Sequence, residues 1–250
     1  MGLNSNPFSL EGKTVLVTGA SSGIGKETAI QCSKMGAKLI ITARNEERLN
    51  ETLSQLDGDG HRMIIAELTN SEDLEKLVSA IDSLQGLVLC AGKGMTALFP
   101  FSTPDKYQSI FNVNFFAPVE LLRLLVKKKK VLKGSSVVFV SSIGGINSFS
   151  VGNGVYGASK AAINSTMKYC AKELAAKTIR VNSVNPGMVN TNLIKSGVIS
   201  EEQQKLDMET YPLKRYGEPY DIACGIIYLL SDAASWVTGH TLVIDGGKTI

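Results

Sequence analysis

The chain has 250 residues, of which 44% are hydrophobic and 20% charged, a composition typical of an ordinary globular protein with a sizeable core. A net charge of +3 is too small to indicate a nucleic-acid partner. The densest basic run, residues 127–130, is expected at a solvated helix end. No apolar run approaches about 18 residues, so we expect no membrane partner and a cytoplasmic location.

The cysteines and histidines do not have the spacing of a metal site. The four cysteines are Cys32, Cys90, Cys170 and Cys224. They are far apart in the sequence, which predicts free thiols in a reducing compartment. With only His61 and His240 in the chain, a histidine-based zinc site is not expected, and we predict no metal.

A strand, a glycine-rich turn and a helix follow one another near the start of the chain. Residues 13–18 form a β-branched run typical of a buried strand, and residues 19–25 (GASSGIG) carry glycines at both ends. A helical pattern then continues to Met35 and ends at Gly36. Such a turn lets the backbone approach a pyrophosphate at the helix N-terminus. A tight turn without a ligand is the alternative, although it needs fewer glycines.

Short apolar strands alternate with helices along the rest of the chain. Further strands are predicted at 37–42, 62–66, 86–90, 136–141, 178–184 and 241–244, and helices at 46–56, 71–84, 115–126 and 156–176. This alternation predicts an α/β fold, a doubly wound parallel sheet of about seven strands with helices on both faces. With no linker or repeat in the sequence, we expect a single domain over residues 1–250. Ligands of such sheets bind at the carboxyl ends of the strands.

Tyr156 and Lys160 lie four positions apart in the last predicted helix, so their side chains share one face. A free tyrosine titrates near about pH 10, and a nearby lysine cation is expected to lower that pKa. The hydroxyl would then serve as a general acid–base. An amphipathic pair on a solvated face is the alternative, and the pair by itself does not exclude it.

Several motifs occur in an order that resembles the single-domain branch of the short-chain dehydrogenase/reductase family, whose sheet is of the Rossmann type. They are the loop at 18–25, Asn114, Ser142, Tyr156 with Lys160, the run 185–187 with Thr191, and the ending 237–247. The resemblance covers nearly the whole chain. It implies hydride transfer between a nicotinamide and a ketone or secondary alcohol.

The resemblance assigns a role to each matching residue. Tyr156 would donate the proton, and Ser142 would bind the carbonyl oxygen. Lys160 would lower the pKa of the tyrosine and hold the nicotinamide ribose, while Asn114 would position a water that links the lysine to solvent. The implied cofactor-binding residues are Gly19, Ser21, Ser22, Gly23, Ile24, Gly25, Arg44, Glu67, Leu68, Ala91, Gly92, Tyr156, Lys160, Pro186, Gly187, Val189 and Thr191.

Three departures from the family pattern stand out. Cys90 occupies the place of a supporting asparagine, which affects stability more than chemistry. Glu67 replaces the usual aspartate near the adenine. Ser142 and Tyr156 are 14 positions apart, one more than is common, so Ser141 is kept as a second candidate for the serine role.

Residues 188–216 follow the nicotinamide motif and are long for a connection, so we predict a small helical lid over the substrate. Its apolar residues, which include Leu193, Ile194, Val198 and Ile199, favour a medium-sized, partly apolar ketone, although the expected role of most of them is to pack the lid. The run 212–219 (PLKRYGEP) is similar to that of 3-oxoacyl-carrier-protein reductases, and related sugar and steroid enzymes share it. A 3-oxoacyl thioester is therefore one candidate substrate.

Two further expectations concern the cofactor and the assembly. After the second strand, Ala43 stands where enzymes that prefer NAD place an acid, and Arg44 can pair with a 2′-phosphate, so we predict NADP(H), with NAD(H) as the second choice. The resemblance and the apolar helices at 115–126 and 156–176 predict a homotetramer, with a dimer as the alternative. The alternative to an enzyme is a nucleotide-binding regulatory protein that senses redox state without significant turnover.

Overall fold

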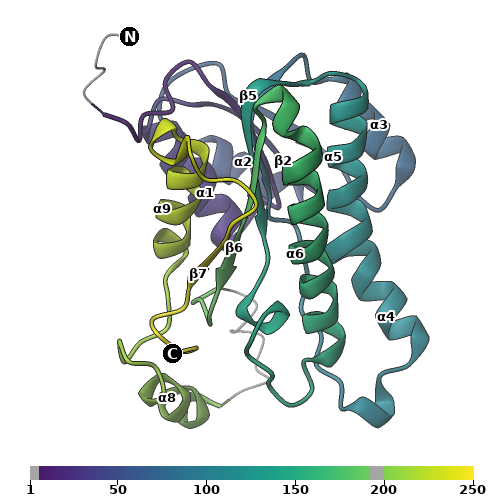
Figure 1. The fold of residues 1–250 in the computed structure, drawn as a ribbon, viewed down its shortest axis with the longest axis vertical. Coiled ribbons are helices and arrows are strands. Elements are labelled where there is room, and N and C mark those ends of the chain that lie inside the picture. Colours follow the sequence, from purple (N-terminus) through teal and green to yellow (C-terminus); the bar gives the residue numbers. More distant parts are fainter. Residues whose placement is uncertain (1–5, 192–199) are drawn as a thin grey trace.

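A seven-stranded parallel sheet runs through the middle of the molecule (Figure 1). The computed structural model describes residues 6–191 and 200–250. The strands are β1 (Thr14–Thr18), β2 (Lys38–Ala43), β3 (Arg62–Ile65), β4 (Leu84–Leu89), β5 (Val131–Val140), β6 (Arg180–Pro186) and β7 (Thr241–Ile244). Their order is β3-β2-β1-β4-β5-β6-β7. The strand order reverses direction between β1 and β4, where ligands of open α/β sheets bind.

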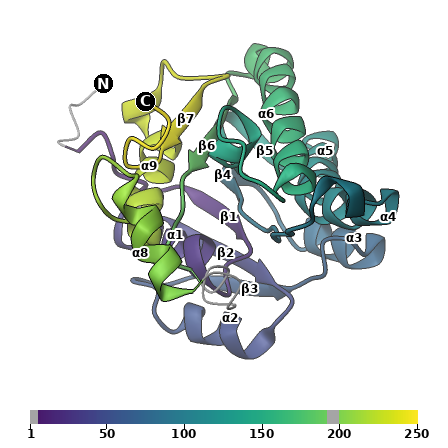
Figure 2. The same ribbon diagram turned by 90° about the horizontal axis from the view of Figure 1, so that it is seen from below.

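Helices cover both faces of the sheet (Figures 1 and 2). They are α1 (Gly23–Lys34), α2 (Glu46–Leu53), α3 (Ser71–Ser79), α4 (Pro104–Phe111), α5 (Ala117–Lys127), α6 (Gly154–Leu174), α8 (Glu201–Glu209) and α9 (Pro219–Leu230). Helices α3, α5 and α6 bury their apolar residues in one core, and α1, α2 and α9 bury theirs in the other. Helix α8 lies near the carboxyl ends of the strands.

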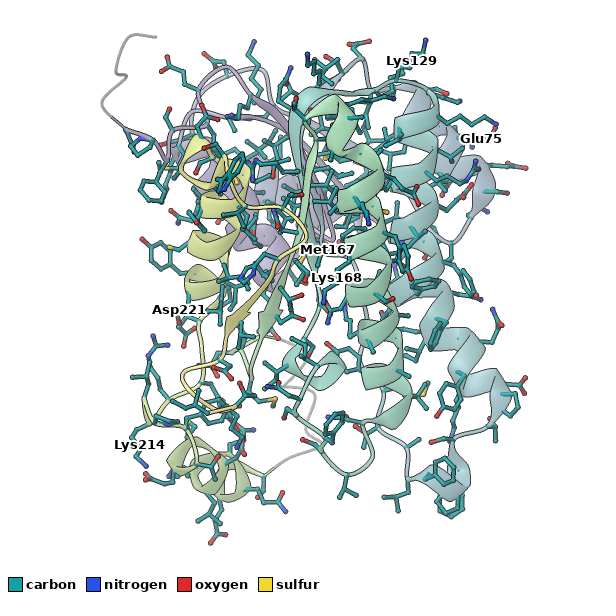
Figure 3. All side chains as sticks on the ribbon, viewed as in Figure 1. Glu75, Lys129, Met167, Lys168, Lys214 and Asp221 are labelled. Carbon is teal, nitrogen blue, oxygen red and sulfur yellow. The ribbon has the colours of Figure 1, made fainter. Side chains whose placement is uncertain are left out.

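The alternation of side chains along each strand explains the two cores. In β1, Leu16 packs with α3, α5 and α6, whereas its neighbours Val15 and Val17 pack on the opposite face. In α6, Met167 is fully buried against the sheet while the next residue, Lys168, is exposed (Figure 3). Central strands that are apolar on both faces are what a parallel sheet covered by helices requires.

The predicted fold class is confirmed, but two predicted boundaries are wrong. Strand β5 begins at Val131 rather than at Ser136, and helix α3 is shorter than expected. We expected a helix over 71–84, but α3 ends at Ser79 and Leu84 is the first residue of β4. Leu77, Ile81 and Leu84 all lie in the same core, so their spacing mimicked a helical stripe. The Leu84 N–H donates to the carbonyl of Lys130 instead, which places this residue in the sheet.

The stretch Pro104–Lys127 is the one described helix that is long and apolar enough to cross a membrane by length and composition alone. It comprises α4, a π-helical turn η2 (Asn112–Phe116) and α5. Leu121, Leu122 and Leu125 of this stretch are buried in the core beside the sheet, and a core helix passes the same test.

Candidate active site

The glycine loop after β1 packs so closely that larger residues would not fit. A Cβ atom on Gly25 would lie 2.4 Å from the carbonyl oxygen of Gly19, and one on Gly19 would lie 2.9 Å from Cα of Ala91. Gly19 and Gly23 also have positive φ angles of 68° and 52°. The loop therefore presents backbone rather than side chains at the carboxyl ends of β1 and β4.

This loop leads into a helix end suited to an anion. Helix α1 begins at Gly23, and its N-cap residue, Ser22, makes no side-chain capping hydrogen bond. No acidic residue lies in the first turn of the helix. Free N–H groups and a positive dipole end without an opposing carboxylate fit a pyrophosphate. The residues present thus fit the phosphate part of a dinucleotide.

A polar cavity of about 390 Å³ lies beside the glycine loop. Its lining residues are Ser21, Ser22, Gly23, Lys26, Glu47, Arg48 and Glu51. The cations Lys26 and Arg48 were not among the predicted site residues. Lys26 follows directly on Gly25 and Arg48 lies in the first turn of α2, so their proximity depends on how the two helices start at the same edge.

Arg44 and Glu67 meet at the ends of β2 and β3. The guanidinium of Arg44 donates to Oε2 of Glu67 at 3.1 Å. The Thr69 N–H and hydroxyl both donate to the other carboxylate oxygen. Burial alone would raise the pKa of Glu67, but the hydrogen bonds from Thr69 and Arg44 hold it below its ordinary value. Leu68, which follows Glu67, is buried.

The residues after β4 and β6 approach the glycine loop from the other side. The N–H groups of Cys90 and Ala91 donate to the hydroxyl of Thr18, which ties the end of β4 to that of β1. A Cβ on Gly23 would lie 3.1 Å from the methyl group of Thr191. Strand β6 ends at Pro186 and the chain continues through Gly187 and Val189, where the Gly187 N–H donates to the carbonyl of Ile244.

Ser142 and Tyr156 come together at the carboxyl end of β5. Ser142 caps the short turn η3 (Ile143–Gly145) by accepting a hydrogen bond from the Gly144 N–H at 3.1 Å. Its hydroxyl also lies close enough to that of Tyr156, near the start of α6, to favour the ionised form of the tyrosine. Ser141, the second candidate, turns inward and donates to the carbonyl of Lys160 at 3.0 Å. This geometry leaves Ser142 as the serine that faces the tyrosine.

Lys160 is only 5% exposed, and its ammonium donates to the carbonyl of Val140 at 2.8 Å. The ammonium nitrogen lies 5.8 Å from the centroid of the Tyr156 ring. Burial lowers the pKa of Lys160 from 10.5 to about 8. Burial likewise raises the pKa of Tyr156, and the nearby hydroxyl of Ser142 offsets only part of that effect. The pKa of Tyr156 is therefore raised overall, because burial dominates, and a lowering contribution from Lys160 stays a prediction.

Asn114 lies in the π-helical turn η2, and its side chain is buried. Its side-chain oxygen accepts a hydrogen bond from the Lys93 N–H. Its side-chain nitrogen donates to the carbonyl of Lys93 and to the hydroxyl of Ser159 on α6. A Cβ on Gly92 would lie 3.2 Å from Oδ1 of Asn114 and 3.5 Å from Nζ of Lys160. Asn114 thus braces the loop after β4 against α6 beside the lysine. Its role in positioning a water stays a prediction.

The predicted lid is described in part. Residues 192–199, which contain Leu193, Ile194, Val198 and Ile199, lie outside the described residues. Of the remainder, Tyr211 is buried and its hydroxyl accepts from the Met188 N–H, whereas Leu206 and Leu213 are exposed. The position of Lys214 beside α8 is visible in Figure 3. Closure over a substrate stays a prediction.

The pKa of Lys160 makes a pH-dependent stability measurable. Between about pH 8 and pH 10.5 the unfolded chain binds a proton that the folded chain has lost, so the free energy of unfolding rises with pH. Below pH 8 Lys160 is charged in both the folded and the unfolded protein, so the full free-energy cost of burying the cation remains. Relative to Lys160→Met, the wild-type protein should gain up to about 3 kcal/mol across this window. Urea unfolding at both ends of the window measures it.

Lys168→Met is the matched control, because Lys168 is an exposed lysine of the same helix. An identical pH dependence in wild type and Lys160→Met would contradict the assigned pKa.

The fold and the site together define a dinucleotide-dependent oxidoreductase, and comparison with known proteins identifies its family. The chain belongs to the short-chain dehydrogenase/reductase family, since residues 19–249 match the family model described as Enoyl-(Acyl carrier protein) reductase. The chain is similar to 3-oxoacyl-[acyl-carrier-protein] reductase FabG of Rickettsia prowazekii, at 34% identity over 95% of this chain and 97% of the relative. It is also similar to 7alpha-hydroxysteroid dehydrogenase of Escherichia coli, at 31% identity over 98% and 97%.

Solved structures support the same family. A structure of Pseudomonas aeruginosa RhlG described as an NADP active-site complex has a TM-score of 0.91 and 28% identity, with 98% of this chain and 100% of that chain covered. A dehydrogenase/reductase from Sinorhizobium meliloti has a TM-score of 0.89 and 30% identity over 98% of each chain. The chain is accordingly an oxidoreductase that acts on CH–OH or C=O groups.

Proposed function

We propose that this protein is an NADP(H)-dependent oxidoreductase that transfers a hydride between the nicotinamide and a ketone or secondary alcohol. The observation that carries the proposal is the pair of Ser142 and Tyr156 beside the buried Lys160, at the same edge of the sheet as the glycine loop. A solvated amphipathic pair, the alternative reading of Tyr156 and Lys160, does not account for a lysine that is 5% exposed.

Each part of the dinucleotide has residues that suit it. The loop from Gly19 to Gly25 and the start of α1 would hold the pyrophosphate. The ends of β2 and β3, with Arg44 and Glu67, would hold the adenosine. Thr191 and Lys160 would hold the nicotinamide side. When bound, NADP(H) supplies or accepts the hydride.

The residues around Tyr156 favour proton donation at neutral pH. Because burial raises the pKa of the tyrosine, its hydroxyl keeps the proton that a reduced carbonyl oxygen needs. Ser142 is held by the Gly144 N–H and would donate a hydrogen bond to the same oxygen, where negative charge develops. Lys160 places a positive charge over the ring, which stabilises the phenolate that forms after proton transfer.

The relatives indicate two classes of substrate. The curated relatives include reductases of 3-oxoacyl groups and a dehydrogenase of a hydroxysteroid, and both names describe ketone or alcohol chemistry on a largely apolar molecule. We propose a ketone of this kind, with a 3-oxoacyl thioester as one candidate.

The test is a panel of ketones assayed for oxidation of NADPH and NADH at neutral pH. Turnover of at least one ketone that depends on Tyr156 supports the proposal. Tight NADPH binding without turnover of any ketone or alcohol would instead favour the redox-sensing regulatory protein, the second candidate function.

We also propose a homotetramer built on the exposed faces of α5 and α6, which lie side by side in Figure 1. Large apolar side chains remain exposed there, among them Phe116 and Tyr169. Equilibrium sedimentation should give the mass of about four chains at micromolar concentration, the commonest assembly after the dimer for such symmetric oligomers. A monomer at that concentration would contradict the proposal.

A further inference from the structure

Six exposed apolar side chains lie on two loops, one after β4 and one between β5 and α6. They are Leu98, Phe99, Phe101, Ile146, Phe149 and Val151, which we call the apolar rim. Phe99, Phe149 and Val151 are each at least 85% exposed. Large apolar residues scattered singly need no explanation, but a cluster on adjoining loops indicates a binding surface.

The two loops of the rim are joined to each other. The Ala97 N–H donates to the carbonyl of Gly152 at 2.8 Å, and a Cβ on Gly152 would lie 2.9 Å from the methyl group of Thr96. The loop after β4 and the loop between β5 and α6 therefore form one surface. Both lie at the lower edge of the molecule in Figure 1, where the strands end.

The rim is continuous with the catalytic groups. Ile146, Phe149 and Val151 lie on the segment that connects Ser142 to Tyr156. The start of this segment packs directly on α6, because a Cβ on Gly157 would lie 2.7 Å from the carbonyl oxygen of Gly144. A substrate whose carbonyl reaches the Ser142–Tyr156 pair would lie next to this segment, because the segment joins the two residues.

The sequence around the rim lacks charge altogether. Residues 94–104 and 141–159 contain no Asp, Glu, Lys, Arg or His. The nearest cations flank the rim and are engaged, since Lys93 donates to the hydroxyl of Ser109 and Lys106 to the carbonyl of Phe101. A phosphate or carboxylate near the reacting carbonyl would lose its hydration here without gaining an ionic partner on the rim itself.

We propose that the apolar rim selects ketones and secondary alcohols that carry an uncharged alkyl or ring group several carbons long, with Phe99 and Phe149 as specificity-determining residues. This inference rests on the proposed function, and names its substrate class. The group would lie across both loops while the carbonyl meets Tyr156. A second copy of the chain is a weaker candidate for this surface, because the assembly proposed above uses other exposed apolar residues, Phe116 at the end of η2 and Tyr169 on α6.

The experiment measures kcat/KM for reduction of unbranched, uncharged methyl ketones of about four to about ten carbons. Each added methylene should raise kcat/KM by about twofold to fourfold until the rim is covered, as expected when apolar surface is partly or fully buried. A 2-oxo acid of matched length should react at least about tenfold more slowly than the methyl ketone, the cost of one unpaired charge at a partly solvated site.

The double variant Phe99→Ser with Phe149→Ser should flatten the dependence on chain length. Trp236→Ser is the matched control, since Trp236 is a fully exposed aromatic outside both loops, and it should keep the wild-type slope. Sedimentation of the double variant tests whether the apolar rim instead binds a second copy of the chain.

The possible outcomes separate the inference from the proposed function. Turnover of short ketones with a flat chain-length profile, or equal rates with the oxo acid, would overturn the rim as a selector and leave the oxidoreductase assignment standing. A double variant that keeps the slope but changes the mass in solution would show that the rim joins copies of the chain, and would also overturn the inference. The absence of any turnover would count against the proposed function itself.

Discussion

Tyr156→Phe should reduce kcat for ketone reduction by about 10²–10⁴-fold, the usual contribution of a positioned general acid. The variant removes one hydroxyl and keeps the ring over which Lys160 lies. Affinity for NADPH should change little, because the glycine loop and the start of α1 are untouched. Stopped-flow hydride transfer and fluorescence titration of NADPH measure the two quantities separately.

Tyr169→Phe is the matched control for this substitution. Tyr169 is an exposed tyrosine on the same helix and faces away from the site, so the variant should keep the wild-type rate. If Tyr156→Phe retains the wild-type rate, Tyr156 is not the proton donor. If instead it loses both rate and NADPH affinity, the hydroxyl has a binding role rather than a catalytic one.

The rates of ketone reduction and of alcohol oxidation should depend differently on pH, because both reactions use the hydroxyl of Tyr156. The raised pKa keeps Tyr156 protonated at neutral pH, which suits reduction of a ketone. Oxidation of an alcohol needs the phenolate, so its rate should rise more steeply with pH than the rate of reduction. This asymmetry follows from burial and was not expected from the Tyr–Lys spacing alone.

Much of the fold could be predicted because each strand is a short apolar run between helices. Buried strands such as Val15–Val17 carry apolar side chains on both faces, and a parallel sheet covered by helices is the fold that accommodates them. The boundary between α3 and β4 could not be predicted, since Leu77, Ile81 and Leu84 fit a helical stripe and a strand start equally well. The structure places Leu84 in β4 rather than in α3 because this residue pairs with the neighbouring strand.

The sequence predicted the parts of the candidate site whose residues lie close together in the chain. It predicted less of what depends on burial and on the packing of separate elements. Ser142 precedes Tyr156 across one loop, so their encounter could be expected. The choice between Ser141 and Ser142 needed the structure, because adjacent residues at a strand end point in opposite directions. The contributions of Lys26 and Arg48 depend on two helix starts meeting in space, which no local pattern indicates.

The preference for NADPH depends on the end of β2. Ala43 provides no carboxylate to accept hydrogen bonds from a ribose 2′-hydroxyl, and Arg44 follows it. In the structure Arg44 is paired with Glu67, but the arginine side chain is 77% exposed. A surface ion pair of this kind is worth about 0–1 kcal/mol, so it offers little resistance to a phosphate dianion. A guanidinium binds phosphate through two charge-assisted hydrogen bonds.

The cavity beside the glycine loop adds to this argument. Lys26 and Arg48 line it together with Ser21 and Ser22, so cationic side chains other than Arg44 lie close to the glycine loop. Glu47 and Glu51 line the same cavity and oppose it. The balance between these charges sets the size of the preference. For that reason we expect a moderate preference for NADPH.

We therefore expect kcat/KM with NADPH to exceed that with NADH by about tenfold to a thousandfold, each factor of ten corresponding to roughly 1.4 kcal/mol. Ala43→Asp combined with Arg44→Ala should shift the preference toward NADH, because it adds an acceptor for the 2′-hydroxyl and removes a phosphate ligand. Arg123→Ala is the matched control, since Arg123 is an exposed arginine paired with Glu120 far from the site, and it should keep the wild-type ratio. An unaltered protein that uses NADH as well as NADPH would show that Arg44 serves only its pair with Glu67.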